Sequence, residues 1–540
     1  MQQKNNSFLK GAAILGIAGI IVKVMGVFFR IPLTNWIGAE GMSYYSSVYP
    51  IYSFFLLISL AGIPVAISRM ISERTSVKNY AGAQKVFNVS VGVMAVIGGI
   101  SMAIVFFGAD FIDSSLLKNP GTKHALQAIA PSLFLVPVMG AYRGYFQGRQ
   151  NMNPTAVSQI MEQLVRVIMG LSLSYYLIKA GTGYDKVSAS AIFGGTAGAA
   201  AGLTVAVVIY LLNRRVIFSQ IARHRSLAVV EPWQDIVKEI LIISIPITIG
   251  ACIYPLVNAI DSMIVMRRLQ AVGFTLTESR VLFGKLGGYC ASLVGMPQVL
   301  TQAIVMSLVP AIAAGYKVKN YDSVRENMQF SMRATMLLSF PCTVGMIALA
   351  YPILLLLYPM QAEEVKSTAL VFAIMSITNV FEGPLVTLTG ILQGINKQMM
   401  PVKNMAIGAV FKVLLTFLLV GIRPINVNGA SVGTIVFCAL GSYLCMRDLK
   451  KSFPVEFDFK DTYVKPLLAS LVMGVSARVS YMVLMMILGR NSICCLLAIC
   501  IAVLVYVIAV FAFKAISLDE LRKLPKGDKL ARIAGKFVRG

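Results

Sequence analysis

The chain has 540 residues, of which 57% are hydrophobic and 13% charged, and its mean hydropathy is +0.76. Soluble globular proteins carry about 25% charged residues, so this composition excludes an ordinary soluble enzyme and indicates an integral membrane protein. A net charge of +25 would suggest nucleic acid in a soluble protein. In a membrane protein, basic loops set topology and contact anionic headgroups, so we expect membrane lipids and no nucleic acid as partners.

Fourteen stretches approach the roughly 20 apolar residues that a spanning helix needs. The first follows basic residues but has no cleavage site after it, so we interpret it as a retained helix and not a signal peptide. Pro32 and Pro384 predict kinks or breaks in the first and tenth stretches. The predicted spans are 9–37, 44–72, 86–109, 124–147, 154–178, 188–212, 238–261, 284–311, 333–357, 366–393, 402–421, 427–446, 464–488 and 492–514.

The basic residues favour one orientation. With the N-terminus inside, the inner segments contain 32 Lys and Arg residues and the outer loops 11. Such a bias predicts an even number of spans with both termini cytoplasmic. The outer loop that holds Arg267, Arg268, Arg280 and Lys285 is the exception.

Two short motifs recur at similar spacing. VKNY at 77–80 recurs at 318–321, and YFQGRQNMNP at 145–154 is similar to ILQGINKQMMP at 391–401. Each copy follows the same span of a six-helix set. Because six is even, the two sets have the same orientation, as in transporters built from parallel repeats.

The fold that we predict is an all-α membrane protein with two six-helix lobes around a central cavity, followed by two C-terminal helices. The N-lobe comprises residues 1–225 and the C-lobe residues 226–450, whereas 451–540 holds spans thirteen and fourteen and a basic cytoplasmic tail. We expect no metal site and no cofactor, because the two histidines lie in loops and the eight cysteines form no Cys-x-x-Cys pair.

Charged side chains inside spans are costly and mark functional sites. Lys23 and Arg30 are seven residues apart and project from nearly one face of span one; the alternative is that both snorkel to the surface. Ser158, Glu162 and Arg166 recur every four residues in span five, and we expect Glu162 to pair with Arg166. That pair has either a structural role or a role in the cavity.

Further polar residues are candidates for other roles. Asn258 and Asp261 lie one turn apart in span seven, and Glu382 precedes a Gly-Pro pair in span ten. Together with Glu162, these residues are candidate sites for a coupling cation, either Na⁺ or H⁺. Residues expected to act as gates or as topology anchors at span ends are Arg69, Arg143 and Arg149.

The sign of these charges separates possible substrates. Lys23, Arg30 and Arg166 against Glu162 would make a cavity net positive, which suits an anion such as a pyrophosphate. An exporter of cationic drugs would need the opposite sign. A membrane glycosyltransferase would need catalytic Asp, Glu or His in a sizeable outer loop, and we predict only short loops.

Three segments resemble a known family. Residues 142–170, YRGYFQGRQNMNPTAVSQIMEQLVRVIMG, and residues 60–73, LAGIPVAISRMISE, resemble the SpoVB (stage V sporulation protein B) and YtgP branch of the multidrug/oligosaccharidyl-lipid/polysaccharide (MOP) exporter superfamily. Residues 296–313 are similar to span eight of the MurJ lipid II flippases. The resemblance implies a two-lobed, fourteen-helix flippase for an undecaprenyl-pyrophosphate-linked glycan, with lipid II as the expected substrate.

The resemblance also implies roles for individual residues. The basic pair of span one in MurJ is matched by Lys23 and approximately by Arg30. The Asp-Arg pair of span eight falls on Ala291 and Ser292, and Lys285, on the same face, is the candidate substitute. The span-two arginine falls near Ser59.

From the residues and the resemblance together we expect a monomeric, multi-pass transporter of the bacterial cell membrane that is not an enzyme. It would bind the pyrophosphate of a lipid-linked oligosaccharide in cell wall (peptidoglycan) biogenesis and move it by alternating access. The alternatives are a cation-coupled drug exporter of the same superfamily and a flippase for another polysaccharide repeat unit.

Overall fold

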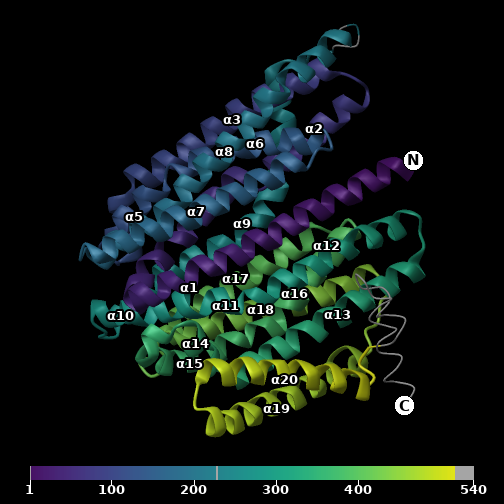
Figure 1. The fold of residues 1–540 in the computed structure, drawn as a ribbon. Helices are drawn as coiled ribbons and strands as arrows, with labels where there is room; N and C mark the ends of the chain where they lie inside the picture. Colours follow the sequence, from purple (N-terminus) through teal and green to yellow (C-terminus); the bar gives the residue numbers. More distant parts are fainter. Residues whose placement is uncertain (1, 225, 227–228, 517–540) are drawn as a thin grey trace. The chain divides into compact units, whose positions relative to one another are not determined.

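The computed structural model describes residues 2–224, 226 and 229–516. All regular secondary structure within these residues is helical (Figure 1), which confirms the all-α prediction. The predicted basic tail lies, from residue 517 onward, outside the described residues.

The chain divides into two compact units, residues 1–284 and 285–540. The helices of the first unit are α1 (Gln2–Leu60), α2 (Ile63–Ser76), α3 (Tyr80–Phe107), α4 (Ala109–Phe111), η1 (Ile112–Leu117), α5 (Thr122–Ile129), α6 (Ser132–Gly148), α7 (Asn153–Lys179), α8 (Tyr184–Arg223), α9 (Trp233–Ala271) and α10 (Leu276–Gly284).

The second unit begins with a π-helical segment at its first residue. Its helices are η3 (Lys285–Cys290), α11 (Ala291–Val294), α12 (Met296–Lys317), α13 (Tyr321–Ala348), α14 (Ala350–Leu357), η4 (Pro359–Gln361), α15 (Ala362–Ser376), α16 (Thr378–Gly394), α17 (Met399–Val420), α18 (Asn428–Ser452), η5 (Lys460–Val464), α19 (Lys465–Leu488) and α20 (Asn491–Ala512).

By length and composition, 13 helices of the described chain can cross a membrane. The first, Ile14–Ser76, has 63 residues. At 1.5 Å per residue it would extend about 95 Å, roughly three times the hydrocarbon thickness of a bilayer. It contains two of the predicted spans and is interrupted at Gly38, where φ is 61° and ψ is −166°. Each of the fourteen predicted spans overlaps one of these 13 helices, although the fourteen-helix arrangement and the grouping into lobes stay predictions.

The helix breaks in the first and tenth predicted spans do not fall at the prolines from which we predicted them. Pro32 lies inside α1, six residues before the interruption at Gly38, and Pro384 lies inside α16, after the turn at Ile377. Gly38 adopts a positive φ that other residues rarely adopt. The interruption of α1 therefore lies at this glycine, whereas the helix continues through Pro32 despite the hydrogen bond that a proline cannot donate.

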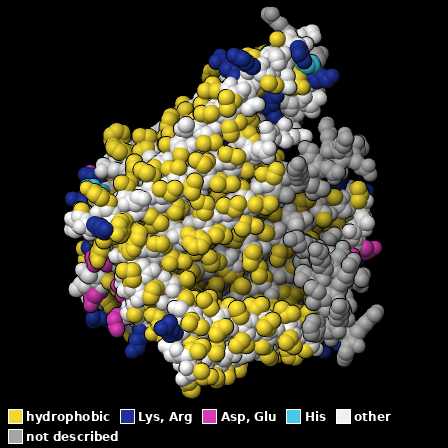
Figure 2. Space-filling model, in the orientation of Figure 1, with side chains coloured by type: hydrophobic (Ala, Val, Ile, Leu, Met, Phe, Trp, Pro, Cys, Tyr) yellow, Lys and Arg dark blue, Asp and Glu magenta, His cyan; other side chains and the backbone are white. Residues whose placement is uncertain are grey.

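Apolar side chains cover most of the visible surface, and charged side chains gather toward the ends of the helices (Figure 2). Large apolar residues are strongly exposed, among them Phe107 (81%) and Met486 (82%). Exposure on this scale is unfavourable in water but expected of a surface that faces lipid. The surface agrees with a multi-pass membrane protein.

The repeated motifs have the same local geometry. α3 and α13 both have 28 residues, and each follows an asparagine, Asn79 or Asn320, whose side chain accepts a hydrogen bond from the N–H three residues on. The lysines before them, Lys78 and Lys319, have φ of 60° and 58°. Both motifs therefore form the same capped turn.

The second pair of motifs agrees as well. α6 and α16 both have 17 residues, and the turns after them place Gln150 and Asn396 at φ of 59° and 61°. These turns are 246 residues apart. This correspondence supports duplication of the helices, while the lobe boundaries at 225 and 450 stay predictions.

The α9 helix packs against α1, α2 and α3 of the first unit. The contact with α2 is close, because a Cβ on Gly62 would lie 2.3 Å from the carbonyl oxygen of Ser244. The Gly62 N–H also donates to the hydroxyl of Thr248 at 3.2 Å. These contacts fix α9 against α2 within the first unit.

Two arginines that we predicted in an outer loop lie on α9 and α10 and make specific contacts in the first unit. Arg280 donates to the side chain of Asn119 at 2.9 Å and lies over the ring of Tyr44 at 4.8 Å. Arg267 donates to the carbonyl of Ser115. These arginines therefore bind neighbouring segments of the first unit, a structural role that would explain the exception to the predicted charge bias.

Candidate functional site

The polar stripe of α7 lies against a row of glycines on α8. Glycines four residues apart lie on one helix face, and without side chains they let two backbones approach closely. A Cβ at any of these glycines would lie 2.4–3.2 Å from a carbonyl oxygen of α7. The pairs are Gly194 with Arg166, Gly198 with Glu162, and Gly202 with Ser158.

Arg143 of α6 completes the stripe. Its guanidinium donates to the Ser158 hydroxyl from Nε (3.0 Å) and Nη2 (2.7 Å), and Nη2 donates to Glu162 at 2.9 Å. The side chains of Arg143 and Glu162 are 14% and 18% exposed. The expected pair of Glu162 with Arg166 is therefore wrong. Four-residue spacing permits that pair, but Arg143 reaches the carboxylate from the neighbouring helix.

Arg166 lies one turn further along α7, among aromatic side chains. A small cavity of about 10 Å³, close to the minimum for one water molecule, is lined by Arg166, Phe29, Tyr45 and Tyr49 together with residues of α5 and α8. The rings of Tyr45 and Tyr49 stack at 5.5 Å with an interplanar angle of 12°.

Arg30 contacts the same aromatic pair. Its guanidinium carbon lies 5.4 Å from the ring centre of Tyr45, a distance at which a cation is attracted to the ring face. Tyr45 thus lies between Arg30 of span one and the cavity beside Arg166. The structure brings together two of the three basic residues predicted to bind an anion.

We call these residues the basic cluster. It holds three arginines and one glutamate, so its formal charge is positive, and hydrogen bonds and aromatic faces hold the guanidinium groups in place. Sequence reasoning missed the tyrosines, although their spacing at 45, 49 and 52 places them on one helix face. The members are Arg30, Tyr45, Tyr49, Arg143, Ser158, Glu162 and Arg166.

Two predicted substrate residues lie elsewhere. Lys23 is an exposed residue of α1, three residues before Gly26, where α1 approaches Gln163 of α7. Lys285 belongs to the second unit and donates to the hydroxyl of Ser367 at 2.8 Å. Neither is part of the basic cluster.

The candidate coupling residues lie in different environments. Asn258 and Asp261 are half-buried on α9, and the backbone carbonyl of Asn258 accepts a hydrogen bond from Ser262 at 3.0 Å. Glu382 is 5% exposed on α16 in the second unit. Among the described residues, no three His, Cys, Asp or Glu side chains are placed to hold a metal ion.

The predicted gate or anchor residues differ in burial. Arg69 is 64% exposed at its side chain and pairs with Glu73 at 2.8 Å on the same helix, as a topology anchor would. Arg149 donates to the hydroxyl of Tyr145 at 2.8 Å and to Gln220 of α8. Arg143, in contrast, is part of the basic cluster.

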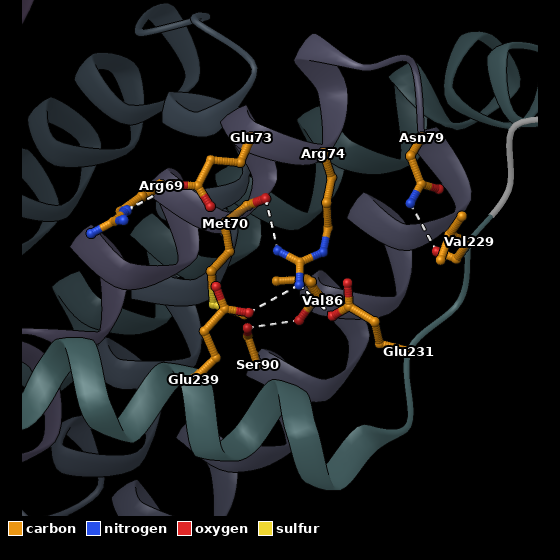
Figure 3. Close-up of polar contacts among 10 residues, drawn as sticks. All are labelled: Arg69, Met70, Glu73, Arg74, Asn79, Val86, Ser90, Val229, Glu231 and Glu239. Atoms are coloured by element: carbon orange, nitrogen blue, oxygen red, sulfur yellow. Dashed lines mark hydrogen bonds and ion pairs between the residues drawn. The ribbon is translucent and has the colours of Figure 1, made fainter.

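An ion-pair cluster that sequence reasoning missed joins α2 to α9. Arg74 donates to the carboxylates of Glu231 and Glu239, the latter at 3.0 Å (Figure 3). Nearby, the Asn79 side chain donates to the carbonyl of Val229 at 2.8 Å. These contacts fix the chain at the start of α9, and no local pattern could show them, because the glutamates are more than 150 residues from Arg74.

Comparison with known proteins agrees with this architecture. The family described as polysaccharide biosynthesis protein matches residues 8–315, and the MatE family matches residues 287–418. Stage V sporulation protein B of Bacillus subtilis is 26% identical over 96% of this chain and 98% of its own length. Lipid II flippase MurJ of the same organism is 26% identical over 89% of both chains.

Among solved structures, lipid II flippase MurJ in an inward closed conformation is similar, with a TM-score of 0.63 and 16% identity over 92% of this chain and 98% of that chain. At this identity the likeness shows the fold. The family match covers more than half of the chain. The chain therefore belongs to the polysaccharide biosynthesis protein family, within the MOP superfamily of flippases and transporters.

Proposed function

We propose that this protein is a flippase that moves an undecaprenyl-pyrophosphate-linked glycan across the bacterial cell membrane by alternating access, and that lipid II is its substrate. The observation that carries the proposal is the positive basic cluster, in which Arg30, Arg143 and Arg166 outnumber Glu162. A relative named as a lipid II flippase supports the choice of substrate.

The chemistry of the cluster suits a pyrophosphate. Guanidinium groups bind phosphate oxygens through two parallel hydrogen bonds, which are about twice as strong as those between neutral groups. An anion that crosses a low-dielectric interior needs such compensation. The partial exposure of Arg143 leaves its outer face accessible to a ligand. Lys23 is proposed as a further contact with the headgroup.

A coupled cation would bind elsewhere. Asn258 and Asp261 place an amide and a carboxylate one turn apart on α9, and oxygen ligands suit Na⁺ or a proton. We propose these residues as the coupling site. We also expect a monomer with both termini cytoplasmic.

The decisive experiment is complementation of a strain depleted of its lipid II flippase, with outer-leaflet lipid II measured in intact cells. The wild-type chain should restore growth and lipid II exposure, and Arg166→Ala should not. Lys179→Ala is the matched control, because Lys179 is a cation on the same helix, exposed and outside the cluster. Growth without lipid II exposure would contradict the proposal.

The MatE match to residues 287–418 makes a cation-coupled drug exporter the second candidate. Its substrates are cations, so loss of the arginines should not abolish export. A drug-susceptibility panel on a deletion strain separates the two proposals. If the deletion strain is more susceptible to drugs, and the Arg166→Ala variant restores full resistance, the exporter is favoured. Failure of lipid II complementation without a drug phenotype would favour a different lipid-linked glycan.

A further inference from the structure

The second unit buries two opposite charges on neighbouring helices. Glu382 of α16 is 5% exposed, and Lys412 of α17 is 1% exposed. Lys412 is one of the largest fully buried side chains of the described chain. Charges at such sites cost several kcal/mol unless a partner compensates them.

Both helices pack on α18, and the contacts converge on one segment of it. The hydroxyl of Ser442 donates to the carbonyl of Phe381, next to Glu382, at 2.8 Å. On the other side, the ammonium of Lys412 lies 5.8 Å from the ring centre of Phe437. A Cβ on Gly408, one turn before Lys412, would lie 3.1 Å from the carbonyl oxygen of Phe437.

Cys438 lies on the same segment of α18. It follows Phe437 in the chain, is fully buried, and its thiol interacts electrostatically with both Glu382 and Lys412. The contacts of Phe381 with Ser442 and of Lys412 with Phe437 thus bring both charged residues to the part of α18 that carries Cys438. We propose that Glu382 and Lys412 form a buried ion pair that joins α16 to α17. In this pair the Lys412 ammonium neutralises the Glu382 carboxylate, so that no cation from solution is needed there.

The sequence repeat relates the helices of this pair to the helices that carry Arg143 and Glu162. An offset of 246 residues relates α6 to α16 and the start of α7 to the start of α17, and it places Lys412 at the position of Arg166. In the first unit, α6 supplies the base Arg143 and α7 the acid Glu162. In the second unit, α16 supplies the acid and α17 the base.

The two pairs differ in their access to solvent. Arg143 and Glu162 remain partly exposed, so a ligand can compete for them. Glu382 and Lys412 are buried, so their pair is a fixed connection between helices. It follows that Glu382 is not a binding site for the coupling ion, because its charge is already neutralised.

The test uses the full-length protein with Glu382→Gln, Lys412→Met, both changes together, and Lys403→Met as control. Lys403 is an exposed lysine on α17. Two quantities are measured: the thermal unfolding temperature in detergent, and modification of Cys438 by N-ethylmaleimide, located by peptide mass spectrometry. Neither depends on transport, so the outcome is separate from that of the proposed flippase.

Each single change should lower the unfolding temperature and accelerate modification of Cys438, because it leaves one buried charge alone. The double change removes both charges and should recover most of the loss. Lowering the pH should reduce the loss of unfolding temperature in Lys412→Met but not in Glu382→Gln, because protonation of Glu382 removes the lone charge of the Lys412→Met variant. Additive losses in the double variant, or single variants that behave like Lys403→Met, would overturn the pairing. Failure of the double variant to accumulate in cells would also overturn it.

Discussion

Arg143 Nη2 lies 2.9 Å from a carboxylate oxygen of Glu162, and the same guanidinium binds the Ser158 hydroxyl. This ion pair joins α6 to α7 and fixes the Glu162 carboxylate one turn from Arg166. Arg143 therefore compensates the charge of Glu162 from the neighbouring helix. The ion pair adds a residue of α6 to the polar stripe of α7, and the resulting basic cluster contains residues of α1, α6 and α7.

The first prediction concerns the coupling of Arg143 and Glu162. Exposed ion pairs contribute about 0–1 kcal/mol, and breaking a fully buried pair costs about 3–5 kcal/mol. Since these side chains are 14% and 18% exposed, we expect Arg143→Gln or Glu162→Gln to cost about 1–3 kcal/mol. A double-mutant cycle on unfolding free energies should show coupling for this pair and little for Glu162 with Arg166. Equal coupling of both pairs would contradict the geometry.

The second prediction concerns the arginines around Tyr45. Arg30→Ala and Arg166→Ala should each reduce lipid II flipping while protein abundance stays near normal. Loss of one charge-assisted hydrogen bond weakens binding by about ten- to hundredfold. Arg30→Lys should retain part of the activity, because lysine keeps the charge without the planar fork.

Lys23 provides a comparison within the same assay. Lys23→Ala should also reduce flipping if this exposed residue contacts the headgroup during transport. Immunoblots control for abundance, and Lys179→Ala is the matched variant on α7. Full activity of the Lys23→Ala, Arg30→Ala double variant would show that the basic face of span one has no role in anion binding.

The third prediction concerns the glycine row of α8. A Cβ at Gly198 would lie 2.4 Å from the carbonyl oxygen of Glu162, so Gly198→Ala must separate α7 from α8. Overpacking of this kind costs about 1–3 kcal/mol. Gly92→Ala on α3 is the control, because nothing lies within 4 Å of its Cβ position, and alanine favours the helix. A lower unfolding temperature for both variants alike would refute the close contact.

The fourth prediction concerns the contact between α2 and α9. Arg74→Ala leaves Glu231 and Glu239 without their shared cation, and because these glutamates are 37% and 38% exposed we expect a loss of about 1–3 kcal/mol. Hydrogen exchange should accelerate at residues 229–240. Arg69→Ala, which removes an exposed pair on one helix, should change neither quantity. Unchanged exchange in Arg74→Ala would show that the cluster does not hold α9.

The fifth prediction concerns topology. A reporter that is active only outside the cytoplasm should be inactive when fused at Gly540 and active when fused in the loop at Arg423, which we predict to lie outside. The basis is the excess of Lys and Arg in the inner segments, 32 against 11. Activity at Gly540 would reverse the orientation.

Local properties of the sequence determined the membrane class, the all-α fold and the places of the long apolar helices. Hydropathy depends only on which side chains follow one another, and the lipid phase demands a continuous apolar stretch for each crossing. For the same reason the four-residue stripe of Ser158, Glu162 and Arg166 was visible before any fold was known. Capped turns such as those at Lys78 and Lys319 are also local, and they have the same geometry in both copies.

Only the tertiary structure decided which charges meet. Spacing alone allowed Glu162 to pair with Arg166, but Arg143 of α6 reaches the carboxylate instead. The glutamates that bind Arg74 are distant in sequence, and only the packing of α9 against α2 brings them together. Electrostatic partnership depends on distance in space and on burial, and a sequence pattern determines neither of them beyond one helix.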